Sequence, residues 1–162
     1  MMDFEKRLEK AIQRGQRAGH VRAQAEAEKA MSEQELRRLH GQYRLDLTEH
    51  LEDCLKTLAE HLPGFRFESL VSDRGWGAAI SRDNAGRQAR TSRSSFFSRL
   101  ELFVRPVSEF FVLELVAKGT VQNKEVFNRS HYQKLADVDL AAFRKLIDAW
   151  ALEYAEIYSA RS

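Results

Sequence analysis

A single cysteine, Cys54, is the only sulfhydryl in a chain of 162 residues whose net charge is +2. One cysteine excludes an internal disulfide and a zinc module built from several cysteines, and it favours a reducing, cytoplasmic setting. Residues 1–15 contain no continuous apolar run, so we expect neither a secretory signal nor a membrane span. A glycine-rich phosphate loop, a nucleophile elbow, a zinc-protease motif and a dinucleotide fingerprint are also missing. We therefore expect no catalytic residue, no cofactor and no metal, and consider an enzyme the less favoured class.

Apolar residues recur at helical spacing in the stretch that follows residue 32. Intervals of three or four residues place eight of them on one side of a helix: Leu36, Leu39, Tyr43, Leu47, Leu51, Leu55, Leu58 and Leu62. Ser32 followed by Glu35 forms a capping box, which predicts that this helix begins at Ser32. Pro63 and Gly64 should end it, because proline is poorly tolerated inside a helix and glycine accepts the angles of an exit turn. We expect the apolar side to pack on a sheet or on another helix.

Residues 1–31 have the composition of a helix but a thin apolar side. Phe4, Leu8 and Ile12 are followed only by Ala18, Val21 and Ala25, and Gly15 and Gly19 weaken a helix by about 1 kcal/mol each. We predict a partly mobile helical arm over 1–31, which either continues into the next helix or folds back on it. Residues 32–162 are then a single α+β domain.

After Pro63 the period of the apolar residues changes from helical to two. The pattern predicts a hairpin over 65–80, two strands over 96–104 and 109–117, and a fifth strand near 126–127 that precedes an irregular stretch. If the four residues 105–108 connect the middle strands, Val104 lies opposite Glu109. One face of this pair is then wholly apolar and must belong to the core. Its members are Leu100, Leu102, Phe111, Leu113 and Leu115.

The opposite face of that pair mixes aromatic and charged side chains. It carries Phe97, Phe103, Phe110, Val112 and Val116 beside Arg99, Glu101 and Glu114. Because so much aromatic surface is unfavourable in water, we expect partial cover by a helix, by the arm or by another subunit. Phe103 and Phe110 are therefore predicted interface residues, together with Phe4, Leu8 and Ile12 of the arm.

The last element should be a helix with an aromatic and aliphatic side. Its apolar positions are Leu140, Phe143, Ile147, Trp150, Tyr154 and Ile157, and Asp137 or Asp139 is the predicted cap. The whole pattern predicts an α+β fold with an antiparallel meander of about 4–5 strands and a C-terminal helix packed on the sheet.

Two small clusters of reactive side chains admit a functional reading. Asp46, His50 and Cys54 follow one another at four-residue intervals, so neighbours could share a metal ion, although all three span about 12 Å and cannot share one. Glu101 and Glu114 could act as acid and base if they meet diagonally across two strands. We favour the plain reading of both clusters: a cysteine at the border of the apolar side, and glutamates in structural ion pairs.

Basic residues provide the alternative functional signal. Residues 83–95 form a predicted flexible basic loop containing Arg87, Arg90 and Arg93, and the arm carries Arg14 and Arg17. These side chains could contact the phosphates of a nucleic acid. The first hypothesis remains a non-enzymatic assembly or adaptor module, which works as a homo-oligomer or with a protein partner; the alternative is a nucleic-acid-associated protein.

Overall fold

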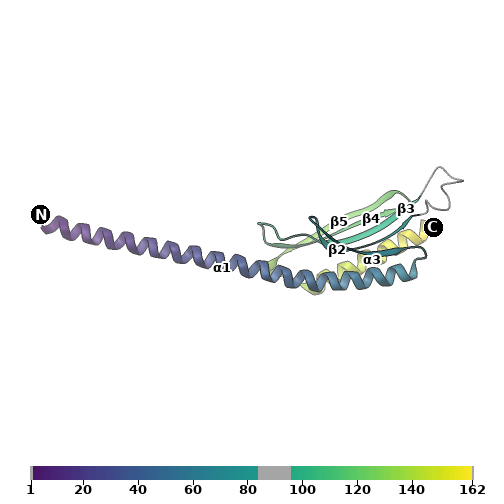
Figure 1. The fold of residues 1–162 in the computed structure, drawn as a ribbon, viewed down its shortest axis with the longest axis horizontal. Coiled ribbons are helices and arrows are strands. Elements are labelled where there is room, and N and C mark those ends of the chain that lie inside the picture. Colours follow the sequence, from purple (N-terminus) through teal and green to yellow (C-terminus); the bar gives the residue numbers. More distant parts are fainter. Residues whose placement is uncertain (1, 84–95, 162) are drawn as a thin grey trace. The chain divides into compact units, whose positions relative to one another are not determined.

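The predicted α+β fold is confirmed by a computed structural model, which describes residues 2–83 and 96–161. A long helix precedes five strands and a last helix (Figure 1). Their bounds are α1 Met2–His61, β1 Arg66–Ser72, β2 Gly75–Asp83, β3 Phe97–Val104, β4 Val112–Val121, β5 Lys124–Lys134 and α3 Leu140–Arg161. A short 3-10 turn, Leu135–Asp137, joins β5 to α3. No helix in these described ranges is both long enough and apolar enough to cross a membrane.

The prediction that a helix begins at Ser32 is wrong, because α1 is continuous from Met2 to His61. Glu35 does not reach back to the serine and instead pairs with Arg38 one turn later. Good helix formers surround the capping-box pattern on both sides, so nothing in the local sequence interrupts the helix there. The C-terminal prediction is confirmed: the helix ends just before Pro63, and Gly64 adopts a positive φ of 85°.

The chain divides into two compact units, Met1–Arg38 and Leu39–Ser162. The first unit is helical throughout its described residues. The second contains the rest of α1, the sheet and α3, and it holds the hydrophobic core.

The sheet is an antiparallel meander in the order β1-β2-β3-β4-β5. Ser72 pairs with Gly75 across a two-residue turn, so the first predicted hairpin is confirmed. At Gly75 and at Gly77 a Cβ atom would collide with the backbone of β3, which explains why glycine is required at both places. The fifth strand is longer than predicted, since pairing with β4 continues through His131 to Lys134 in place of an irregular stretch.

The predicted register between the two middle strands is wrong. Val104 lies opposite Leu115 and not opposite Glu109, because the connection extends to Phe111, whose φ of 50° turns the chain into β4. The difference is six residues, an even number, and therefore the residues that lie in the strands keep their predicted faces. Leu100, Leu102, Leu113 and Leu115 are all fully buried, as expected of the core face. Phe111 is the exception and lies half-buried in the connection.

Two helices cover this apolar face: α3 and the part of α1 within the second unit lie along the same side of the sheet (Figure 1). From α1 the buried leucines are Leu47, Leu51 and Leu55, and Leu62, just after the helix, is buried as well. From α3 the buried residues are Phe143, Ile147, Trp150, Ala151, Tyr154 and Tyr158. Tyr154 is fully buried and donates its hydroxyl hydrogen to the backbone oxygen of Thr120, 2.8 Å away, so the core satisfies its polar group. Asp139 caps α3 by accepting the backbone N–H of Ala142.

Candidate functional site

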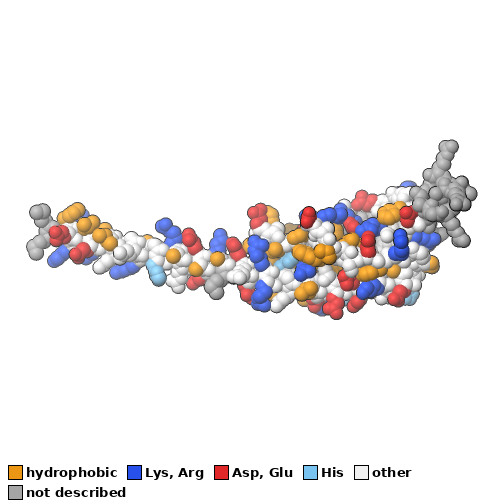
Figure 2. All heavy atoms as spheres, viewed as in Figure 1, with side chains coloured by type: hydrophobic (Ala, Val, Ile, Leu, Met, Phe, Trp, Pro, Cys, Tyr) orange, Lys and Arg blue, Asp and Glu red, His pale blue; other side chains and the backbone are white. Residues whose placement is uncertain are grey.

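The helix of the first unit carries exposed apolar side chains near its start. Phe4, Leu8 and Ile12 are 67%, 47% and 50% exposed, and every described side chain from residue 3 to 30 is exposed. Steps of four residues advance by 400° around a helix, so these three side chains lie within about 80° of one another. Figure 2 shows hydrophobic side chains gathered at the beginning of α1. The residues predicted for the interface therefore form one apolar strip, here called the arm strip (Phe4, Leu8 and Ile12).

Basic side chains of the same unit are exposed as well. Arg14 and Arg17 line a shallow recess along the helix with Arg7, Lys10 and Gln13. The other predicted phosphate contacts, Arg87, Arg90 and Arg93, lie outside the described residues, as does most of the predicted basic loop at 83–95.

The mixed face of the sheet has a different character from the one predicted. Phe103 and Val116 are only 5% and 6% exposed. The guanidinium of Arg74, at the hairpin turn, lies over the Phe103 ring, 5.1 Å from its centroid. This side chain covers the ring, whereas we expected cover by a helix, by the arm or by another subunit. Phe110, in the connection between β3 and β4, is 76% exposed. Of the two aromatic residues predicted for an interface here, Phe110 alone presents its ring to solvent.

Glu101 and Glu114 do not form a pair of carboxylates. Glu101 lies opposite Lys118 and accepts hydrogen bonds from Arg74 and Arg99. Glu114 lies opposite Tyr132 and pairs with Arg105 at 3.5 Å. Each glutamate is thus held by arginine, which is the plain reading, and the register leaves the two carboxylates on separate ion pairs.

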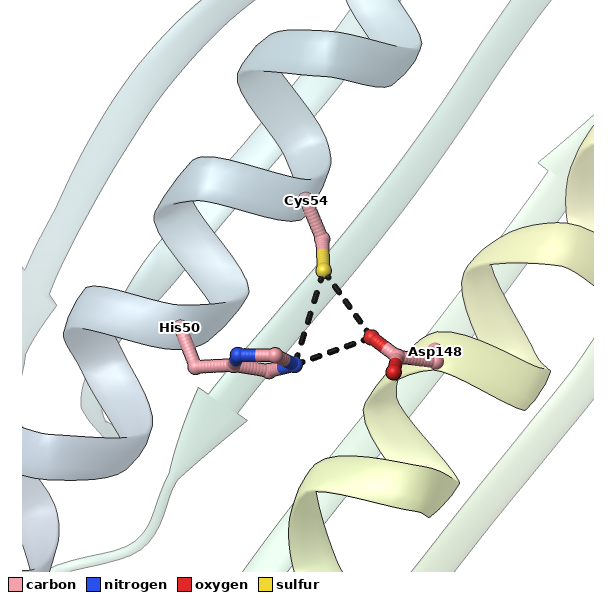
Figure 3. Close-up of side chains that lie close together, drawn as sticks. All are labelled: His50, Cys54 and Asp148. Carbon is pink, nitrogen blue, oxygen red and sulfur yellow. Dashed lines mark hydrogen bonds and ion pairs between the residues drawn. The ribbon is translucent and has the colours of Figure 1, made fainter.

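Three different ligand types meet between α1 and α3: the imidazole of His50, the thiol of Cys54 and the carboxylate of Asp148 (Figure 3). His50 Nε2 lies 2.9 Å from Asp148 Oδ1, and Cys54 Sγ lies 3.2 Å from the same oxygen and 3.7 Å from His50 Nε2. His50 and Cys54 are one turn apart on α1, while Asp148 projects from α3. We name these three residues the HCD cluster.

The geometry of the HCD cluster differs from that of a nucleophilic triad. In such a triad the carboxylate holds one ring nitrogen of histidine and the nucleophile faces the other. Here the thiol and the carboxylate both face Nε2. Burial, followed by the nearby carboxylates of Asp148 and Asp53, raises the pKa of the Cys54 thiol to about 12. The thiol is therefore protonated at neutral pH in the free protein and is a poor nucleophile.

A groove opens beside the cluster between the two helices. It has a volume of about 570 Å³. Residues of α1 and α3 other than the cluster line it, namely Asp53, Thr57, Leu58, His61, Ala151 and Leu152. The side chains of His50 and Asp148 are 30% and 51% exposed, so the cluster is accessible from solvent.

From the sequence we predicted that His50 and Cys54 lie together, but not that Asp148 joins them. The i, i+4 spacing on one helix is visible in the sequence, whereas Asp148 is 94 residues from Cys54 and arrives only because α3 packs beside α1. Asp46, the third member of the predicted group, instead accepts two hydrogen bonds of 2.7 Å from Arg144. That contact anchors α3 to α1 one turn away from the cluster.

The fold and its surfaces define an α+β protein in which two helices cover one face of a five-stranded meander. Comparison of the chain with models of protein families, with curated proteins and with solved structures gives no significant match.

Proposed function

We propose that this protein is a non-enzymatic assembly module that pairs with a second copy of itself through the helix of its first unit. The observation that carries the proposal is the arm strip, which leaves three large apolar side chains about half exposed or more. Full burial of such a side chain stabilises a protein by about 1.5–3 kcal/mol, so completing the burial of each is worth about 1 kcal/mol. Six such side chains from two copies, each strip packed on the helix of the other copy, exceed the cost of association by a small margin at most. We therefore expect a weak dimer whose population depends on concentration.

The charges along the helix favour a second copy as the occupant of this surface. Residues 6–22 hold six cationic side chains and one carboxylate, a net charge of +5. Residues 26–35 hold four carboxylates and one lysine, a net charge of −3. Two copies in antiparallel orientation place the basic segment of each against the acidic segment of the other, whereas parallel copies oppose like charges. Because exposed ion pairs contribute only about 0–1 kcal/mol each, the charges select the orientation and the apolar contacts supply the strength.

The test is the mass in solution of Leu8→Asp beside Leu45→Asp. Leu45 is also an exposed leucine of α1, but it lies in the second unit, so the control makes the same substitution outside the proposed contact. We expect Leu8→Asp to be monomeric at concentrations where wild type and Leu45→Asp associate. Circular dichroism should show all three proteins folded. Equal association by the two variants would refute the proposed contact.

Nucleic-acid binding is the second candidate, and the exposed Arg14 and Arg17 favour it. The double charge reversal Arg14→Glu with Arg17→Glu separates the two functions. In an assembly module it weakens association less than Leu8→Asp does, because exposed ion pairs contribute only about 0–1 kcal/mol each and the apolar contacts remain. A protein that binds phosphates through these arginines would instead lose affinity for random DNA or RNA and show a flatter salt dependence, because fewer counterions are released.

A further inference from the structure

We propose that the HCD cluster is a zinc site, in which His50 Nε2, Cys54 Sγ and one carboxylate oxygen of Asp148 bind a single Zn²⁺ ion. Zinc prefers nitrogen and sulfur ligands and accepts carboxylate oxygen, and it binds three protein ligands where a fourth position stays open. Mg²⁺ and Ca²⁺ prefer oxygen, so the thiol and the imidazole select against them. The site lies in the second unit and is independent of the proposed pairing of the arm.

The distances within the cluster fit a tetrahedral ion. Zinc bonds of about 2.0–2.3 Å at tetrahedral angles separate the ligand atoms by about 3.3–3.6 Å. The three separations here are 2.9, 3.2 and 3.7 Å. Only a small outward movement of the Asp148 oxygen is needed, and its side chain is half exposed and can make it. In Figure 3 all three ligand atoms point toward one common position between α1 and α3.

The arrangement of the helices supplies a site that needs no rearrangement of the backbone. Ligands at i and i+4 face the same way on a helix, as in known helical zinc motifs. The Arg144–Asp46 ion pair holds α3 against α1 one turn before the cluster, and Ala151 and Tyr154 are buried one turn or more beyond it. Asp148 is therefore held beside α1 by contacts on both sides of it.

Electrostatics around the cluster also favour a cation. The carboxylates of Asp148 and Asp53 both act on the Cys54 sulfur. When the sulfur bonds to zinc, the thiol proton passes to solvent, and the ion supplies the positive charge that the thiolate lacks in the free protein. The competing explanation is a hydrogen-bonded cluster, in which the Cys54 thiol and a protonated Nε2 of His50 both donate to Asp148.

The fourth position faces the groove between α1 and α3. Among the described residues the convergent set has three members, which leaves that position for water or a small ligand. His61 also lines the groove, but it is seven residues from Cys54, about 10 Å along the helix, so it cannot join the set. His61 Nδ1 instead lies 2.9 Å from the backbone oxygen of Thr57. His61 is consequently a suitable control residue.

The experiment uses the full-length protein without an affinity tag, treated with chelator and then titrated with Zn²⁺ and, separately, with Co²⁺ as a spectroscopic probe. We expect one ion per chain, a higher melting temperature with zinc, and tetrahedral cobalt bands with a sulfur-to-cobalt charge-transfer band. Cys54→Ser should abolish the charge-transfer band. Loss of an outer partner of a metal ligand already weakens metal binding by about 10- to 100-fold, so Cys54→Ser, His50→Gln and Asp148→Asn should each weaken it at least as much.

The control His61→Gln should bind zinc as the wild type does. Asp148→Asn is nearly isosteric and keeps an acceptor for the thiol, so it tests the metal without disturbing the packing of α3. No binding by the wild type would leave the cluster as a set of hydrogen bonds and would overturn the proposal. So would wild-type affinity in Cys54→Ser and Asp148→Asn, or a loss in His61→Gln as large as in His50→Gln.

Discussion

Replacement of Leu51 by alanine tests whether α1, the sheet and α3 share one core. Leu51 is fully buried at the centre of the leucine series of α1. The change removes three carbon atoms, worth about 0.8 kcal/mol each in transfer free energy, and leaves a cavity that adds a further cost. We expect a loss of about 3 kcal/mol in the free energy of unfolding. For a protein of about 150 residues this lowers the melting temperature by about 6–12 °C.

The assay is thermal and urea unfolding followed by circular dichroism, with Leu45→Ala as the matched control. Leu45 is on the same helix but is 60% exposed. Because an exposed substitution usually changes stability by no more than about 0.5 kcal/mol, the control should melt within about 2 °C of the wild type. If Leu51→Ala melted together with Leu45→Ala, the assignment of Leu51 to the core would be refuted.

Two further predictions concern a buried histidine and the orientation of the arm. Burial lowers the pKa of His40 below its ordinary value of 6.5, so the unfolded chain binds the proton more readily and the free energy of unfolding should fall as the pH drops below 6.5. In urea titrations at several pH values, His40→Gln should lose less stability on acidification than the wild type does. An identical pH profile for the two proteins would contradict this cause. Antiparallel pairing of the basic segment (6–22) with the acidic segment (26–35) places the two-fold axis near residue 22. Spin labels at Gln13→Cys in a Cys54→Ser background are each nine residues from that axis, so they should lie about 27 Å apart along the helix. A measured separation near 10 Å would instead indicate parallel copies.

The faces of the sheet could be predicted from the sequence, but the pairing of its middle strands could not. Alternation of Leu100 and Leu102 with charged residues identifies the core side whatever the partner strand is. The register depends on where the turn closes, and that is decided by the positive φ of Phe111 and by the hydrogen bond that its N–H donates to the Ser108 oxygen. Local residue preferences give no warning that a phenylalanine will adopt that conformation.

The candidate sites were predictable to different extents. The arm strip is local, since Phe4, Leu8 and Ile12 are near in sequence, and their exposure follows from the thin apolar side of the helix. Two of the three residues of the HCD cluster are neighbours in the sequence. His50 and Cys54 share one helix, whereas Asp148 comes from a helix at the other end of the chain, and a single sequence contains no signal for that contact.

The most direct test of the proposed assembly is the mass of the wild-type protein in solution at two concentrations. One chain has a mass of 18.7 kDa, and a dimer is twice that, 37.4 kDa. Because the arm strip supports only a weak association, sedimentation equilibrium at about 1 µM and about 500 µM should span the transition. We predict a mass near that of one chain at the lower concentration and approaching two chains at the higher. A mass of one chain at both concentrations would contradict self-assembly through the arm.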